Sequence, residues 1–222
     1  MSPAASRGLE QRLSHDVVVV VAALLPELGI GYQGRLPWRL RREMKYFVDV
    51  TTGSRNTSAL ALGSRNAVIM GRRTWESIPL RFRPLKNRLN VVLSRLFDDF
   101  LLNSENENIV YSNGLDNAIE RLQQLESINR IFIIGGAEVY NLALKNEKVN
   151  RVLLTEINSI GGLDHKMDTF LDFGAEEQKK WEKKSTQELR DFVGENVDVA
   201  AEDIEENGFR YRYTLWHKKQ SK

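Results

Sequence analysis

The fold expected for this chain is decided by residues 17–50, which read VVVVVAALLPELGIGYQGRLPWRLRREMKYFVDV. Residues 17–25 form an unbroken apolar run, which is typical of a strand buried on both faces. A loop with three glycines follows over residues 29–38, and Pro37 fixes its end. The next segment predicts a helix with apolar positions at Leu40, Met44, Phe47 and Val48. This order of strand, mobile loop and helix favours an α/β domain.

Glu43 falls within the expected apolar face of this helix, where a carboxylate is costly unless it has a partner. It could pair with Arg39, four residues earlier, and lie at the helix edge. Alternatively, it could lie in a cleft walled by Leu36, Trp38 and Phe47, with the raised pKa of a functional acid. The glycine-containing loop favours the second interpretation, because a mobile loop could close over such a cleft.

The composition is that of a globular protein with a full core. The chain has 222 residues, of which 41% are hydrophobic and 28% are charged, and both shares are ordinary for a soluble domain. The net charge of only +2 does not favour a nucleic-acid partner. The chain has no cysteine, which excludes disulfides and zinc–thiolate sites, and its three histidines are too scattered to predict a metal site.

The expected domain covers residues 16–219, and residues 1–15 are expected to be a disordered tail. This tail faintly resembles a mitochondrial transit peptide, but Glu10 interrupts the pattern. No apolar run approaches the roughly 20 residues that a membrane span needs. We therefore expect a cytoplasmic protein that needs neither a membrane nor a nucleic acid.

Two segments after the first helix indicate anion binding. A strand expected at residues 67–70 runs directly into residues 71–79, GRRTWESIP. The free N–H groups and the dipole of a helix start both favour an anion there. A second basic segment, residues 81–88, leads into a strand at residues 89–93 that ends in Ser94 and Arg95. A hydroxyl beside a guanidinium suits a phosphomonoester, although such a pair alone is more often ordinary loop surface.

The remaining chain repeats the alternation of strands and helices. Strands are expected at residues 109–111, 131–134 and 151–157, and an amphipathic helix follows the first of them. The strand at 131–134 runs into Gly135-Gly136 and a helix from Ala137, which is not the G-x-G-x-x-G fingerprint. We expect loops at 51–66 and 96–108, a loop-rich acidic segment without chemistry at 161–208, and a half-exposed closing strand at 209–217. The alternation predicts a largely parallel sheet with ligands beyond the carboxyl ends of its strands.

Several short motifs, each modest alone, are highly specific in combination. They are GIGYQGRLPW, the E-x-x-Y-F that begins at Glu43, GRRTWESIP, RPLKNR, LSR, IIGGAEVY and the threonine of the strand RVLLTEI. Together they resemble dihydrofolate reductase, most closely its fungal form, over residues 17–155 and the last strand. The resemblance implies one domain with a mostly parallel central sheet, an antiparallel C-terminal strand, flanking helices and an adenosine-binding subdomain. It also implies a monomer that reduces dihydrofolate to tetrahydrofolate with NADPH and binds antifolate inhibitors.

The resemblance further implies a role for each matched residue. Glu43 would hold the pterin ring with Thr155 as its hydroxyl partner, and Leu36 and Trp38 complete the catalytic set. Arg88 would clamp the carboxylate of the glutamate tail. The other implied substrate contacts are Val20, Val21, Ala22, Met44, Phe47, Ile78, Leu85, Ile134 and Tyr140. The implied cofactor contacts are Ala22, Ile30, Gly71, Arg72, Arg73, Thr74, Leu93, Ser94, Arg95, Gly135, Gly136, Ala137, Glu138 and Val139, and no metal is implied.

Within the cofactor set, Arg73 and Thr74 would hold the pyrophosphate, while Arg72, Ser94 and Arg95 would read the ribose 2′-phosphate. The resemblance also implies cis peptide bonds before Pro84 and between the two adjacent glycines. Two alternatives remain open at this point. One is a reductase of the pyrimidine type used in riboflavin synthesis, which would not need Glu43 and Arg88. The other is a non-catalytic module that binds pteridines or nucleotides.

Overall fold

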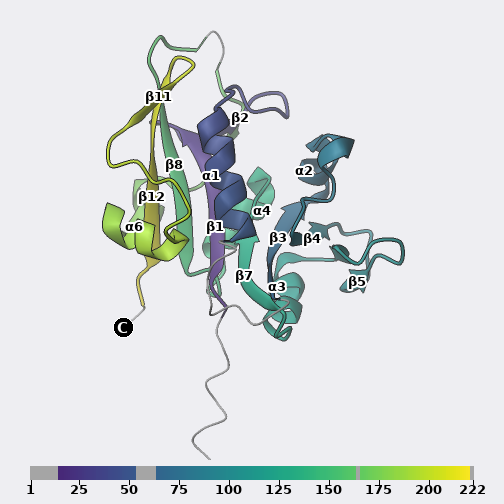
Figure 1. Ribbon diagram of the computed structural model, residues 1–222. Helices are drawn as coiled ribbons and strands as arrows, with labels where there is room; N and C mark the ends of the chain where they lie inside the picture. Colours follow the sequence, from purple (N-terminus) through teal and green to yellow (C-terminus); the bar gives the residue numbers. More distant parts are fainter. Residues whose placement is uncertain (1–14, 54–63, 164–165, 221–222) are drawn as a thin grey trace, which may run out of the picture.

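The computed structural model describes residues 15–53, 64–163 and 166–220 and is dominated by one sheet (Figure 1). The strands of this sheet are β1 Val17–Leu24, β2 Gly29–Gly31, β3 Arg65–Gly71, β4 Arg88–Leu93, β5 Leu101–Leu102, β6 Ile109–Ser112, β7 Ile128–Ile133, β8 Arg151–Ser159, β9 Thr169–Phe170, β10 Trp181–Lys183, β11 Ile204–Glu206 and β12 Phe209–Lys218. Their order is β10-β12-β8-β1-β7-β3-β4-β6-β5, while β11 pairs with β12, and β2 pairs with β1 and β9.

The middle of the sheet is parallel and its C-terminal part is antiparallel. Strand β1 runs parallel to β7 and β8, and β3 runs parallel to β4 and β7. Strand β12 runs antiparallel to β8. These pairings confirm the expected fold class. They also place the C-terminal ends of β1, β3, β4 and β7 along one edge of the sheet.

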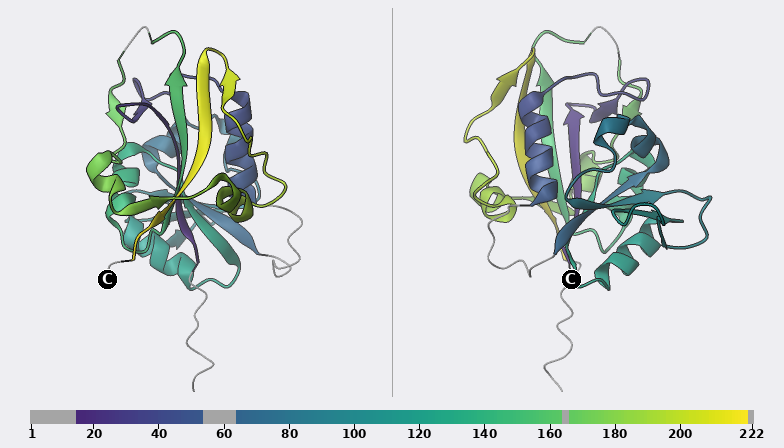
Figure 2. Two further views of the ribbon diagram at one scale, coloured as in Figure 1. Left: turned by 90° about the vertical axis from the view of Figure 1, so that its left-hand side faces the viewer. Right: turned by 45° about the vertical axis from the view of Figure 1, so that its right-hand side comes forward.

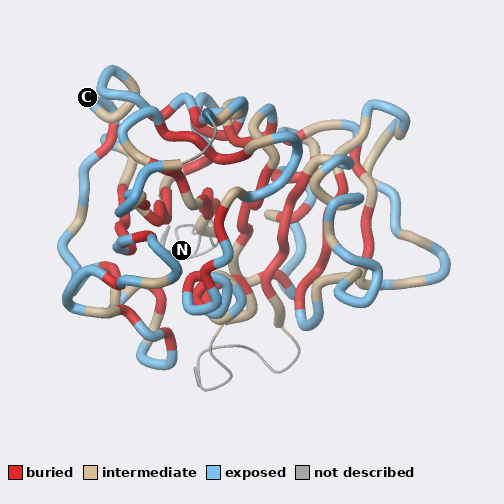
Figure 3. The backbone as a smooth tube through the Cα atoms, turned by 90° about the horizontal axis from the view of Figure 1, so that it is seen from above, coloured by how far each residue is buried: buried red, intermediate tan, exposed pale blue. Residues whose placement is uncertain are grey.

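Helices cover both faces of the sheet (Figure 2). They are α1 Arg41–Thr52, α2 Arg72–Ser77, α3 Leu115–Gln123, α4 Ala137–Lys145, α5 Ala175–Gln178 and α6 Thr186–Val193, with a 3-10 turn at Leu80–Phe82. Helices α1 and α6 pack with Val18 and Val20 of β1 on one face, whereas α3 and α4 pack with Val17, Val19 and Val21 on the other. The apolar run of β1 is unbroken because each face of the strand packs into a different part of the core. Figure 3 shows the buried segments in the interior of the molecule and the exposed segments around them.

Helix α1 presents a different face to the sheet from the one expected. Met44 and Val48 are 48% and 40% exposed, whereas Glu43, Tyr46 and Val50 are buried. The reason is that the ring of Tyr46 stacks on Tyr213 of β12, with centroids 3.8 Å apart. This aromatic contact turns the helix so that Glu43, three residues before Tyr46, also faces inward.

The predictions of three loops are partly wrong. Helix α1 extends to Thr52 and β3 begins at Arg65, so both elements enter the expected loop at 51–66, of which residues 54–63 lie outside the described part. Strand β5 interrupts 96–108. The segment 161–208 contains β9, α5, β10, α6 and β11, and several of its apolar side chains join the core. Helix α6 begins with a capping box between Ser185 and Glu188, a local sequence signal that the acidic composition obscured.

Other expectations agree with the structure. Strand β12 is half exposed over its first residues, where Arg210 and Arg212 alternate with buried aromatic side chains. The expected cis peptide bonds at Arg83–Pro84 and Gly135–Gly136 are both present, and Leu25–Pro26 is also cis. The predicted tail at residues 1–15 lies outside the described residues except for its last residue. None of the described helices is long and apolar enough to cross a membrane.

Candidate active site

The first feature of the site is the buried carboxyl group of Glu43, in the first turn of α1. Its side chain is only 8% exposed, and Thr155 of β8 donates its hydroxyl to Oε1 over 3.3 Å. Strand register places Thr155 beside Ala22 of β1. Arg39 forms no ion pair with Glu43 in the described structure, so the interpretation of Glu43 as a helix-edge partner of Arg39 is wrong. Glu43 is instead a buried acid whose carboxyl group is held against Thr155 of β8.

The surroundings of Glu43 determine its protonation. Burial, the largest effect, raises the pKa of Glu43 from 4.5 to about 7; the hydrogen bond from Thr155 opposes this rise and the negative charge of Glu206 adds to it. A carboxyl group with such a pKa holds a proton part of the time at neutral pH. It can therefore give a proton to a bound base or share one with it.

Apolar side chains surround the acid on the α1 side of the sheet. One cluster contains most of the predicted wall residues, namely Val20, Ala22, Trp38, Phe47, Ile78, Leu85 and Ile134. Leu36 and Met44 are about half exposed and do not belong to it. Trp38 is 5% exposed, and its Nε1–H has no hydrogen-bond partner within the described residues. A buried donor without a partner is unusual and fits a polar ligand atom or a water at this position.

Four predicted contact residues belong to the opposite core, namely Val21, Ile30, Val139 and Tyr140. Val21, Ile30 and Tyr140 pack with α3 and α4, so the side chains of the first two point away from Glu43. Tyr140 donates its hydroxyl to the carbonyl oxygen of Val20 over 2.8 Å. Its ring also lies close under Gly135, where a Cβ atom would come within 3.1 Å of it. Tyr140 therefore ties α4 to β1 and shapes the turn after β7.

Arg88 is a buried cation. It begins β4, one residue earlier than expected, and is only 5% exposed. Its Nη1 donates to Thr51 Oγ1 over 2.6 Å and its Nε donates to the carbonyl oxygen of Lys86 over 3.0 Å. No carboxylate pairs with it among the residues that the structure describes. Burial lowers the pKa of Arg88 to about 10, which still leaves it charged at neutral pH. Such a group is ready to bind an anionic ligand.

Glu43 and Arg88 mark the two ends of α1. Arg88 is hydrogen bonded to Thr51, eight residues after Glu43 on the same helix. At a rise of 1.5 Å per residue, these positions are separated by about 12 Å along the helix axis. A ligand that reaches both groups must therefore be elongated, with a ring that can be protonated at one end and an acid at the other.

A narrow glycine turn lies next to this site. The N–H of Gly71, at the end of β3, donates to the carbonyl oxygen of Gly135 over 2.8 Å. A Cβ atom on Gly136 would come within 3.1 Å of Thr74 Oγ1, and one on Gly71 would come within 3.3 Å of Val139. Only glycines leave room here, so a ligand can approach the backbone closely. Ala137 and the exposed Glu138 follow in the first turn of α4.

Cationic and hydroxyl groups follow the next strand ends. Gly71 of β3 lies in register with Leu93 of β4, so that Arg72 and Ser94 follow from neighbouring strand ends. Arg72 is exposed and pairs with Glu76 at 3.7 Å. Arg73 and Arg95 are also exposed, and neither forms an ion pair with another described residue. The topology thus brings the predicted phosphate-binding residues to one edge of the sheet, beside the glycine turn.

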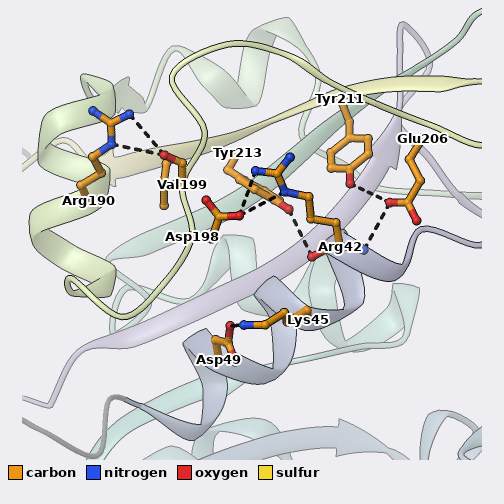
Figure 4. Close-up of polar contacts among 9 residues, drawn as sticks. All are labelled: Arg42, Lys45, Asp49, Arg190, Asp198, Val199, Glu206, Tyr211 and Tyr213. Atoms are coloured by element: carbon orange, nitrogen blue, oxygen red, sulfur yellow. Dashed lines mark hydrogen bonds and ion pairs between the residues drawn. The ribbon is translucent and has the colours of Figure 1, made fainter.

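One group of residues near the site was missed at the level of the sequence. Glu206, Asn207, Tyr211 and Tyr213 surround the first turn of α1 (Figure 4 shows three of them). The available signal was the Asn207-Gly208 pair before an alternating strand, which is typical of a hairpin turn. That signal predicts the hairpin but not its contact with a helix more than 150 residues earlier.

Comparison with known proteins gives a consistent result. The dihydrofolate reductase family model matches residues 17–205. The dihydrofolate reductase of Candida albicans is 45% identical over 204 residues, which cover 92% of this chain and 98% of the relative. The enzyme of Saccharomyces cerevisiae is 41% identical, with 91% and 97% covered. The solved structure of Schistosoma mansoni dihydrofolate reductase is similar with a TM-score of 0.67 at 32% identity, covering 92% of this chain and 99% of that one.

Proposed function

Because the chain belongs to the dihydrofolate reductase family, we propose that it transfers a hydride from NADPH to 7,8-dihydrofolate and forms 5,6,7,8-tetrahydrofolate. The observation that carries this proposal is that a buried acid and a buried guanidinium lie at opposite ends of α1. Glu43 provides an acid with a pKa near 7 at the first turn of α1. Arg88 of β4 provides a guanidinium beside the last turn of α1, and no described carboxylate pairs with it.

The substrate fits this arrangement lengthwise. Its pterin ring would contact Glu43 and the apolar cluster around Phe47 and Ile78, and its glutamate carboxylate would meet Arg88. A guanidinium binds a carboxylate through two parallel hydrogen bonds, which fixes the tail as well as attracting it. Met44 and Leu36, both half exposed, would be covered when the ligand lies over them.

Glu43 would hold the proton that the reaction needs. Reduction of the pterin requires a proton on the ring nitrogen next to the carbon that accepts hydride, and Glu43 is the buried acid that would lie beside that position. The Nε1–H of Trp38, which has no partner among the described residues, would orient a water or a polar edge of the pterin in the same region. The acid and the bound pterin would titrate as a coupled pair, so the apparent pKa of the hydride step belongs to both.

The residues for the cofactor fit NADPH. When bound, the nicotinamide ring supplies the hydride. The glycine turn at Gly135-Gly136 would admit the pyrophosphate to the backbone, with Thr74 and Arg73 beside it. Arg72, Ser94 and Arg95 would bind the 2′-phosphate, which distinguishes NADPH from NADH. Tight packing around Gly136 supports this placement, because a side chain there would fill the space.

The test is to measure single-turnover hydride transfer in a Glu43→Gln variant. The reaction is monitored through the loss of NADPH absorbance at several pH values. We expect the rate at neutral pH to fall by roughly 10²–10⁴, the usual effect of a positioned acid or base. The loss should shrink at low pH, where solvent can protonate the substrate. Glu126→Gln, which removes an exposed carboxylate, serves as the matched control. A Glu43→Gln enzyme with the parental rate and pH profile would refute the role of Glu43.

The same assay with dihydrofolate and a methotrexate-type inhibitor also tests the two alternatives. A reductase of the pyrimidine type would not turn over dihydrofolate, and a binding module would be stabilised by ligands without turnover. We further propose that the enzyme is a cytoplasmic monomer and that antifolates bind along α1 as the substrate does. Light scattering of the purified protein, with and without inhibitor, tests the monomer.

A further inference from the structure

The N-terminus of α1 depends on a residue from the far end of the chain. Leu40 is at the N-cap position and offers no side-chain hydrogen bond. The first N–H groups of a helix have no partner within the helix. Here the carboxylate of Glu206, at the end of β11, accepts from the N–H of Arg41 over 2.6 Å and from the N–H of Arg42 over 3.2 Å. Glu206 therefore acts as the cap that the local sequence lacks.

The hairpin that carries Glu206 is itself held against the helix (Figure 4). Tyr211 donates its hydroxyl to Glu206 Oε2 over 3.0 Å, and Tyr213 donates to the carbonyl oxygen of Arg42 over 3.4 Å. Asn207 donates to the carbonyl oxygen of Arg39 over 2.6 Å. Asp198, in the loop before β11, pairs with the side chain of Arg42 at 2.8 Å. The contacts made by Asn207, Tyr213 and Asp198 are directed at residues 39–42, immediately before Glu43.

We propose that Glu206 is a positioning residue of the active site, which anchors the first turn of α1 and thereby holds the carboxyl group of Glu43 against Thr155. Glu43 follows Arg42 directly, so a shift of the capped turn moves the acid as well. The proposal rests on the proposed function only in the role that it gives to Glu43. The contact between Glu206 and the helix stands on the geometry alone.

The charge of Glu206 has a second effect on Glu43. The positive end of a helix dipole stabilises a carboxylate in the first turn and so favours loss of the proton. A negative charge on the same N–H groups counteracts this. Partial burial raises the pKa of Glu206, but the hydrogen bonds from Arg41, Arg42 and Tyr211 outweigh it and lower the pKa below the ordinary value, so the group is ionised at neutral pH.

The other groups that face Glu43 are not carboxylates. They are Thr155 of β8, Tyr46 of α1, Tyr140 of α4, and Tyr211 and Tyr213 of β12. Burial raises the pKa of each of these tyrosines, which keeps them neutral. Among the described residues, the remaining negative charge that acts on the acid is that of Glu206. Both its hydrogen bonds and its charge help Glu43 to keep a proton near neutral pH.

The experiment separates the effect of side-chain length at position 206 from the effect of its negative charge. Glu206→Gln keeps the length of the side chain and loses the charge, whereas Glu206→Asp keeps the charge and shortens the reach. Asp198→Asn is the matched control, because it removes a carboxylate that contacts α1 through a side chain and not through the backbone. The titration of the Glu43 carboxyl carbon is followed by NMR in the ligand-free protein, with Glu43→Gln used to assign its signal. Hydrogen exchange of the Arg41 and Arg42 amides is measured in the same samples.

In Glu206→Gln we expect the Glu43 midpoint to fall by about 0.5 pH unit, the size that helix-terminus charges produce. The descending limb of the pH profile for hydride transfer should move by the same amount, which makes that variant about threefold slower on the limb. Glu206→Asp should retain most of the midpoint but exchange the Arg41 and Arg42 amides faster. Asp198→Asn should change neither quantity.

A Glu206→Gln protein with the parental Glu43 titration and parental amide exchange would overturn the proposal. Failure of the proposed function is distinguishable from this result. If Glu43→Gln kept the parental rate, Glu43 would lose its catalytic role, while the NMR titration would still decide whether Glu206 acts on Glu43.

Discussion

Replacement of Glu43 by glutamine should change how the stability of the ligand-free protein depends on pH. The folded protein binds the proton of Glu43 more tightly than the unfolded chain does, because burial raises the pKa from 4.5 to about 7. Below pH 4.5 the group is protonated in both states and costs nothing. As the pH rises from 4.5 to about 7, the carboxyl group of residue 43 ionises in the unfolded chain but stays largely protonated in the folded protein. The free energy of unfolding therefore falls over this range.

The size of the effect follows from the same two values. A difference between 4.5 and about 7 corresponds to about 3 kcal/mol at about 1.4 kcal/mol per pH unit. Glutamine has a similar shape and no ionisable group, so the variant lacks this dependence. The free energy of unfolding of the parent, relative to Glu43→Gln, should therefore fall by up to about 3 kcal/mol between pH 4 and pH 8.

Denaturant unfolding of both proteins at several pH values, without ligand, measures this difference. Every other titrating group contributes to both curves and cancels when they are subtracted. Glu126→Gln provides the control for the loss of one negative charge at an exposed position. A parent-minus-variant difference that stays flat between pH 4 and pH 8 would show that Glu43 ionises as easily in the folded protein as in the unfolded chain. That result would refute the argument that burial raises the pKa of Glu43.

Two further predictions concern the ligands. In a variant that combines Ser94→Ala with Arg95→Leu, the preference for NADPH over NADH should fall, by about 1.5–3 kcal/mol for each charge-assisted hydrogen bond that the substitutions remove; unchanged discrimination between the two cofactors, measured as a ratio of kcat/KM values, would remove these residues from the 2′-phosphate site. Arg88→Leu should weaken dihydrofolate binding far more than it slows single-turnover hydride transfer, and it should barely affect a pteridine that lacks the glutamate. Equal losses of binding for the two pteridines would indicate that Arg88 acts through its hydrogen bond to Thr51 instead.

Much of the sheet could be predicted from local sequence. The run of valines in β1 indicates a strand that is buried on both faces. Gly71 and the Gly135-Gly136 pair mark the ends of β3 and β7. The face of α1 could not be predicted in the same way. Counting apolar residues favoured Met44 and Val48, whereas the stack of Tyr46 on Tyr213 decided which side turned inward. That partner lies on a strand formed near the end of the chain.

The need for partners that are distant in sequence also decided which parts of the candidate site could be predicted. Glu43 could be identified because an acid among apolar positions is anomalous within one helix, and a family resemblance gave it a role. The cap supplied by Glu206 has no such local sign, because the acid and the helix that it serves are 165 residues apart. Arg88 appeared in the sequence as one of several basic residues. Only the structure shows that it is buried and lacks a carboxylate partner among the described residues.

The separation between Glu43 and Arg88 along α1 has a consequence for inhibitors. Thr51, which holds Arg88, lies about 12 Å from Glu43 along the helix axis, and substitutions at that separation usually act independently when they share no partner. The free energies that they contribute to binding should therefore add. A compact compound that contacts only Glu43 would lose its whole anchor through one substitution there, whereas a compound that also reaches Arg88 would keep the second contribution intact.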